Sequence, residues 1–82
     1  MMLETGSVVR SAAGRDKGRF LAVVGICGKY VSVCDGKERP AERPKRKNIR
    51  HIEDTGERLE KAELNSNRAL RKALRRFNNG NT

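Results

Sequence analysis

Basic side chains are the residues of this chain that could do chemistry, and they fall into three groups. The first group, on a loop with glycines at 14 and 18, comprises Arg15, Lys17 and Arg19. The second group, with one asparagine among its cations, comprises Arg43, Lys45, Arg46, Lys47, Asn48 and Arg50. The third group, in the C-terminal part, is represented by Arg71 and Arg75. Lysine and arginine neutralise phosphates and release counterions, so each group predicts salt-sensitive binding to a polyanion.

Each group also has an ordinary surface interpretation. Glycine permits a positive φ or a close backbone approach, so Gly14 and Gly18 predict a tight loop that can lie against a phosphate. A solvated turn is the alternative for this loop, and a basic loop kept for solubility is the alternative for the second group. Like charges four residues apart, such as Arg71 and Arg75, repel in an isolated helix. That spacing favours a helix that faces either open solvent or a polyanion.

The overall charge of the chain favours binding to a polyanion over a merely solvated surface. The 82 residues carry a formal net charge of +9 and have a sequence pI of about 10.4. Such a balance predicts a nucleic-acid partner in preference to a membrane surface. No apolar run approaches the roughly 20 residues that a membrane span needs. The start of the sequence, MMLETGSVV, lacks a basic segment before an apolar stretch, so we expect a cytoplasmic protein without a signal peptide.

Neither the histidine nor the two cysteines belong to a recognisable catalytic or metal-binding motif. His51 has no nucleophile or paired carboxylate in a readable pattern. A hairpin turning at Gly28-Lys29 would set Cys27 opposite Tyr30 and Cys34 opposite Val23, leaving the sulfurs roughly 13 Å apart along the sheet. A disulfide needs Cα atoms closer than about 7 Å. We therefore expect reduced cysteines, no metal, no cofactor and no enzymatic activity.

Three strands position the first loop and the following hairpin. Residues 7–11, 20–27 and 30–35 are rich in β-branched side chains, and Gly28-Lys29 separates the last two. Alternation in the third strand predicts that Val31 and Val33 are buried on one face. Prolines predict an extended loop or irregular edge over 36–47, and residues 48–53 could close the sheet.

The C-terminal part is predicted to be helical. Asp54 with Glu57 fits a capping box, and Asn65-Ser66-Asn67 either caps a second helix or weakens one long helix. Asn78-Asn79-Gly80 is a plausible stop. The helical spacing of an apolar stripe predicts a face that packs on the sheet, although a membrane-surface helix is the rival. The stripe comprises Leu70, Ala73, Leu74 and Phe77.

Aromatic residues are scarce, which argues against reading of a base sequence in single strands. Phe20 lies within an apolar strand and is expected in the core. Tyr30 lies beside the hairpin turn, where partial burial is preferred over a stacking role.

The order of these motifs resembles a known family. Residues 6–18 resemble the KOW motif, and the hairpin and the run Lys45–Ile52 follow in the same order as in the archaeal and eukaryotic large-subunit ribosomal protein of the fourteen-e family. The chain is also similar to short bacterial KOW-domain RNA-binding proteins. The resemblance covers roughly residues 4–54. It implies an SH3-like (KOW) barrel over 1–54, followed by a charged helical extension over 55–82.

The resemblance also implies a function. In the family the first loop and the basic segment contact RNA, which here implies contacts by Arg15, Lys17, Arg19 and by Lys45, Arg46, Lys47. We predict a non-enzymatic protein that binds ribosomal RNA on the ribosome or during its assembly, with ribosomal proteins as further partners and no membrane or small-molecule substrate. The alternatives are a protein-interaction module of the translation or transcription machinery and a non-specific DNA-binding protein.

Overall fold

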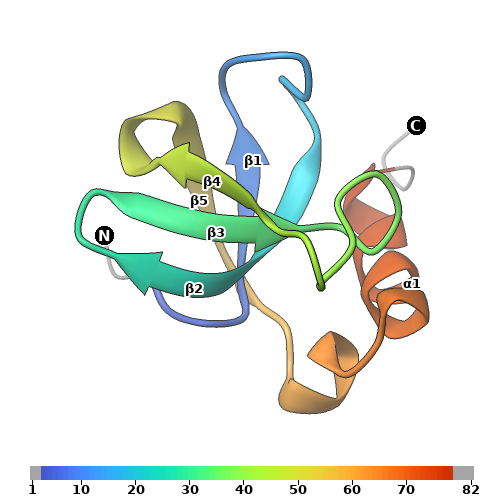
Figure 1. The fold of residues 1–82 in the computed structure, drawn as a ribbon. Helices are drawn as coiled ribbons and strands as arrows, with labels where there is room; N and C mark the ends of the chain where they lie inside the picture. Colours follow the sequence, from blue (N-terminus) through green and yellow to red (C-terminus); the bar gives the residue numbers. More distant parts are fainter. Residues whose placement is uncertain (1–2, 79–82) are drawn as a thin grey trace.

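The strands come first along the chain and one α-helix follows them (Figure 1). The computed structural model describes residues 3–78. The strands are β1 (Ser7–Ser11), β2 (Phe20–Cys27), β3 (Tyr30–Cys34), β4 (Lys45–Asn48) and β5 (Ile52–Arg58). The helical elements are the 3-10 turns η1 (Ile49–His51) and η2 (Lys61–Leu64) and the α-helix α1 (Asn67–Asn78). The predicted stop at Asn79-Gly80 lies outside the described residues.

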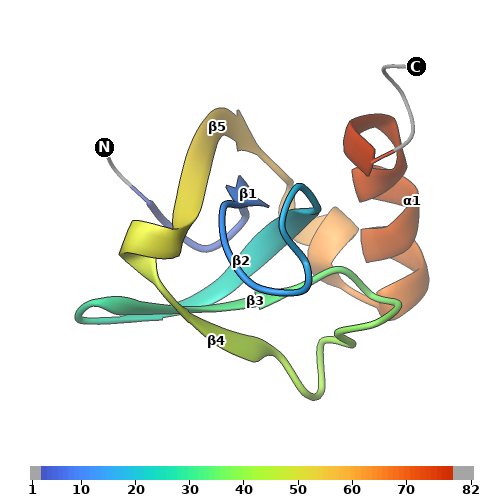
Figure 2. The same ribbon diagram turned by 90° about the horizontal axis from the view of Figure 1, so that it is seen from above.

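The five strands form one antiparallel sheet in the order β4-β3-β2-β1-β5. The sheet curls, and η1 joins the two strands that form its edges, β4 and β5 (Figure 2). The prediction of a mainly β fold with a C-terminal helix is confirmed. The strand pairing, however, leaves an open sheet and does not close into a barrel.

The predicted hairpin forms, but its register is correct only near the turn. Cys27 lies opposite Tyr30, as expected, whereas Cys34 lies opposite Ala22 and not opposite Val23. An irregularity between Val23 and Gly25 shifts the pairing by one residue. Such a β-bulge inserts one extra residue into one strand and cannot be read from alternation alone.

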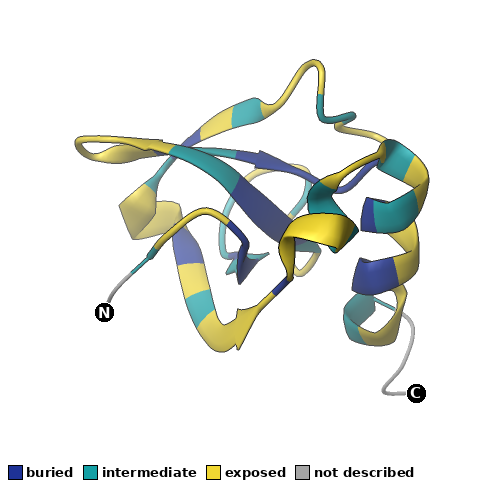
Figure 3. Ribbon diagram, turned by 90° about the horizontal axis from the view of Figure 1, so that it is seen from below, coloured by how far each residue is buried: buried dark blue, intermediate teal, exposed yellow. Residues whose placement is uncertain are grey.

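The three central strands bury apolar side chains on both faces. One cluster contains Val9, Leu21, Val23, Val31, Val33 and Ile52. The other cluster joins Val8, Ala22 and Cys34 to Leu59, Leu70, Ala73 and Leu74. The helical stripe of the prediction therefore packs on the sheet, as Figure 3 shows by the buried inner face of α1. The third strand, by contrast, is buried on both faces at its Cys34 end, because Cys34 packs in the cluster under α1, whereas Tyr30 at its other end is exposed.

The region after the basic segment differs from its prediction. Asp54 and Glu57 do not begin a helix, because β5 continues through both and pairs with β1. The Thr55 hydroxyl donates to Val8 O at 2.7 Å, which fixes this pairing in the middle of β5. Strand β5 therefore crosses the division expected at residue 54.

Two further elements resolve alternatives that the sequence left open. The loop expected over 36–47 ends in a short edge strand, β4, whose first residue is Lys45. Ser66 caps a separate helix, since its hydroxyl accepts from Ala69 N at 3.1 Å. Among residues 3–78, no helix is long and apolar enough to cross a membrane.

Helix α1 is hydrogen-bonded to the segment between β3 and β4 near its start and to β2 at its end. Near its start, Asn67 Oδ1 accepts from Ala41 N at 2.7 Å, and Arg71 Nη1 donates to Gly36 O at 3.0 Å. At its end, Asn78 Oδ1 accepts from Phe20 N at 2.9 Å. These bonds fix the basic face of α1 relative to the turn that follows β3.

We expect Gly36→Ala to loosen this attachment. Gly36 has a φ of +80°, and an added Cβ would lie 2.3 Å from Asn67 O. The positive φ costs about 1–2 kcal/mol, and the overpacked contact adds about 1–3 kcal/mol. Urea unfolding should therefore show a larger decrease in the free energy of unfolding for Gly36→Ala than for Gly28→Ala. Gly28 has a φ of +60° but no neighbour within 4 Å of an added Cβ, so equal losses would contradict the close contact.

Candidate nucleic-acid interface

The first loop is held in place by a buried lysine. Lys47 Nζ donates to Asp16 Oδ1 and to Ala13 O, both at 2.9 Å, and its side chain is only 6% exposed. The Ser11 hydroxyl donates to the same Asp16 oxygen at 2.8 Å. Lys47 on β4 therefore ties down the 12–19 loop. Its ammonium is buried and already paired, whereas the predicted phosphate contact requires an accessible cation.

These contacts also set the ionisation of Asp16. Burial raises the pKa of this carboxyl, but hydrogen bonds from Lys47 and Ser11 and the charges of Lys47 and Lys45 outweigh it. The net effect is a pKa below the ordinary value of 3.8. Asp16 is therefore a carboxylate in the folded protein at neutral pH, and the loop is held by an ionic contact.

Strand geometry divides the central basic run between the two faces of the sheet. Successive residues of a strand point to opposite faces. Lys47 turns toward Asp16, and Lys45 does the same, with its Nζ 3.7 Å from Asp16 Oδ2. Arg46 points to the other face, where its guanidinium lies over the Tyr30 ring at 4.5 Å from the centroid. The three residues do not form one patch.

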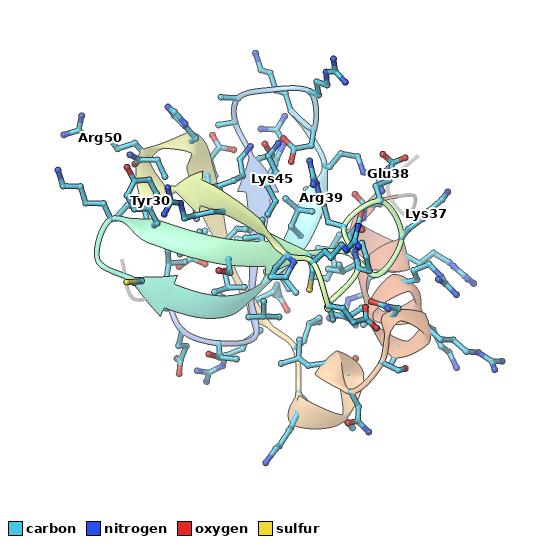
Figure 4. The ribbon with its side chains drawn as sticks, in the orientation of Figure 1. Tyr30, Lys37, Glu38, Arg39, Lys45 and Arg50 are labelled. Atoms are coloured by element: carbon cyan, nitrogen blue, oxygen red, sulfur yellow. The ribbon has the colours of Figure 1, made fainter. Side chains whose placement is uncertain are left out.

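A cleft lies between the first loop and the turn after β3. It has a volume of about 400 Å³. Its basic lining residues come from the first loop, from the segment between β3 and β4 and from the first residue of β4, and they are Arg15, Arg19, Arg39 and Lys45. Figure 4 shows Lys45, Arg39, Glu38 and Lys37 following one another from the middle of the sheet toward α1.

A second cleft of about 270 Å³ continues toward the helix. It shares Arg19 and Asp35 with the first cleft and adds basic residues of the turn and of α1. The seven cations that line one or both clefts are here called the basic band: Arg15, Arg19, Lys37, Arg39, Lys45, Arg71 and Arg75. Three segments that are distant in the sequence therefore supply one continuous surface.

Asp35 organises the centre of the basic band. Its Oδ1 accepts from the backbone amides of Lys37 and Arg39 at 2.9 and 3.0 Å, which shapes the turn. Its Oδ2 lies 3.4 Å from Arg19 Nη2. Because Asp35 is buried while Arg19 is nearly half exposed, the carboxylate steers a guanidinium that still reaches solvent.

The structure brings together only part of the predicted site. Arg15, Arg19, Lys45, Arg71 and Arg75 join the basic band. The remaining predicted residues line neither cleft. Lys17, Arg43, Arg46 and Arg50 are exposed elsewhere, and Asn48 caps η1 by accepting from Arg50 N at 2.9 Å.

Sequence reasoning missed Lys37 and Arg39. Both belong to the strongly basic stretch 37–50, but the prediction gave weight only to the run that begins at Arg43. Their position beside Asp35-Gly36 was the available signal, because an aspartate before a glycine orders the amides that follow it.

The two cysteines differ in their exposure to solvent. Cys27 and Cys34 are free, with Cys27 exposed and Cys34 buried. Burial, with the charges of Asp35 and Glu42, raises the pKa of the Cys34 thiol to about 11. It is therefore an uncharged packing residue at neutral pH. Within residues 3–78, no group of three or more His, Cys, Asp or Glu side chains is placed to hold a metal ion.

A scan against protein-family models and a search of curated proteins both found no match to this chain. The fold and the site themselves define a small, mainly β protein. A curled five-stranded antiparallel sheet carries one C-terminal helix, and the basic band runs from the first loop to that helix.

We expect Lys47→Met to reduce stability more than Lys45→Met. The first change leaves the Asp16 carboxylate without its main buried partner, which costs about 1–3 kcal/mol. The second removes a longer and more exposed pair, for which about 0–1 kcal/mol is typical. Urea unfolding of both variants measures the difference. Equal stabilities would contradict the structural role of Lys47.

The stability difference between the wild type and Asp16→Asn should depend on pH. The pKa of Asp16 is lowered on folding, so its carboxylate stabilises the fold above the unfolded value of 3.8. That contribution is lost as the pH falls from 3.8 through the folded pKa. The deficit of Asp16→Asn should therefore be largest at neutral pH and shrink in acid. A deficit that stays constant across this pH range in thermal unfolding would contradict the ionic contact.

Proposed function

We propose that this protein is a non-enzymatic RNA-binding protein whose basic band lies along the phosphates of structured RNA. The observation that carries the proposal is the convergence of cations from the first loop, the β3–β4 segment and α1 on two clefts that share Arg19 and Asp35. Cations at fixed spacing on a rigid surface suit a polyanion with regularly spaced charges.

The amount of free positive charge supports the same proposal. Asp16 and Asp35 neutralise part of the basic band through Lys45 and Arg19. Arg15 and Arg39 line the first cleft without an ion pair among residues 3–78. The surface therefore keeps unpaired cations next to cations whose positions are fixed by carboxylates.

The resemblance of the sequence to KOW proteins supports the finer part of the proposal. It favours ribosomal RNA, on the ribosome or during its assembly, as the target. It also favours interpreting the curled sheet as a variant of the SH3-like barrel, in which the first loop faces RNA. In that interpretation α1 belongs to the interface, because Arg71 and Arg75 line the second cleft.

The test is neutralisation of the basic band. The triple variant Arg15→Gln, Arg39→Gln, Arg75→Gln should bind structured RNA more weakly. The slope of log K against log salt should also become shallower by about 2–3 if three phosphate contacts are lost, since each contact contributes roughly 0.7–0.9. Filter binding over a series of salt concentrations measures both quantities.

A matched control separates the position of the charge from its amount. Lys61→Gln, Arg68→Gln, Lys72→Gln removes the same charge from exposed residues that line neither cleft. This control should leave affinity and salt slope nearly unchanged. Equal effects of the two triple variants would overturn the basic band as the interface, and stronger binding to duplex DNA than to RNA would overturn RNA as the partner.

A further inference from the structure

Tyr30 is an aromatic residue that the core does not use. The other two aromatic rings, Phe20 and Phe77, pair at 5.7 Å beside the cluster under α1. Tyr30 lies at the hairpin end of the sheet, away from α1 (Figure 4), and remains 39% exposed. Its ring is already in contact with the Arg46 guanidinium.

The strand register places several polar groups around this ring. Tyr30 pairs with Asn48, and Ser32 pairs with Arg46, so all four lie on one face of the sheet. The neighbouring β2 residue on this face, Gly25, pairs with Ser32 and has no side chain. The contacts of α1 on this face are to Ala22, Cys34 and other residues beyond Ser32, so the Tyr30 end stays uncovered. These four residues, Tyr30, Ser32, Arg46 and Asn48, are here called the platform.

The chemistry of this platform differs from that of the basic band. No aspartate or glutamate occurs in residues 23–34 or 43–52, which include β3, β4 and the part of β2 that pairs with Tyr30 and Ser32. The cations Lys29, Arg46 and Arg50 are all exposed. The carboxylates that moderate the basic band are therefore missing from these two segments, and the platform favours an anionic partner with a flat, unsaturated group.

The contacts of Arg46 and Asn48 narrow the partner further. A guanidinium is planar and stacks on an aromatic ring, and its opposite face can stack on a base. Asn48 Oδ1 accepts from Arg50 N, so its NH2 group points away from that bond. Within residues 3–78 this NH2 group has no hydrogen-bond partner, so it can donate to the edge of a base.

We propose that Tyr30, Arg46 and Asn48 form a binding site for one unpaired RNA base, with Arg50 beside it for a flanking phosphate. This inference rests on the proposed RNA-binding function and adds the kind of RNA to it: a duplex interrupted by a bulged nucleotide. The basic band binds the phosphates of the duplex, and the platform binds the one base that is unpaired and unstacked. Stacking tolerates any base, so the site reads the presence of an unpaired base and not its identity.

The test compares two RNA duplexes that differ by one bulged nucleotide. The wild type should bind the bulged duplex roughly fivefold to hundredfold more tightly than the fully paired one, as expected for one stacked base. Tyr30→Ala should remove this preference while leaving affinity for the paired duplex unchanged. Tyr30→Phe keeps the ring and should keep the preference. A 2-aminopurine at the bulge should change its fluorescence on binding to the wild type and not to Tyr30→Ala.

Arg46→Lys is the charge-matched control, because it keeps the cation and loses the planar group. It should lose most of the preference without changing the salt slope. A wild type that binds both duplexes equally would overturn the base site and leave the basic band standing, whereas binding to neither duplex would overturn the proposed function. Tyr30-dependent binding of a polyglutamate peptide in place of the bulged RNA would assign the platform to a protein partner and overturn the inference.

Discussion

The central strands β1, β2 and β3 carry apolar side chains on both faces, and the rest of the structure depends on covering both. The curl of the sheet encloses one face. The other face, which includes Val8, Ala22 and Cys34, is buried under α1 together with Leu59. Removing the helix would expose residues that are now fully buried. Helix α1 is therefore part of the folded unit, and the same packing that completes the core delivers Arg71 and Arg75 to the second cleft.

A single lysine shows how this small protein turns charge into structure. With only 35% hydrophobic residues, the chain has little apolar material to hold its loops. Lys47 substitutes for such material at the first loop, where its ammonium bridges Asp16 and Ala13 O. The hydrogen bonds that Asp16 Oδ1 accepts from Lys47 and Ser11 offset part of the cost of burying these charges. The positive charge of the chain therefore overstates the number of cations that are free to meet a partner.

Much of this fold could be predicted from the sequence, because its strongest signals are local. The β-branched runs, the turn at Gly28-Lys29 and the apolar stripe of α1 were each identified correctly, since each depends on near neighbours. The errors arose where distant pairing decides. The extra residue in β2 shifted the register of Cys34, and pairing with β1 made a strand of residues 52–58. The placement of the candidate site residues also depends on this pairing. Arg46 and Lys47 point to opposite faces of the sheet because they are successive residues of β4.

The basic band and the platform orient their cations in different ways. In the basic band, Asp35 and Asp16 sit among the cations, which lowers the net attraction but fixes where Arg19 and Lys45 point. Around Tyr30 the segments 23–34 and 43–52 contain no carboxylate, and Arg46 is oriented by an aromatic ring in place of an acid. A ring orients a guanidinium without neutralising it. The band is thus suited to holding an extended polyanion in one register, and the platform to a single contact in which full charge and a flat surface act together.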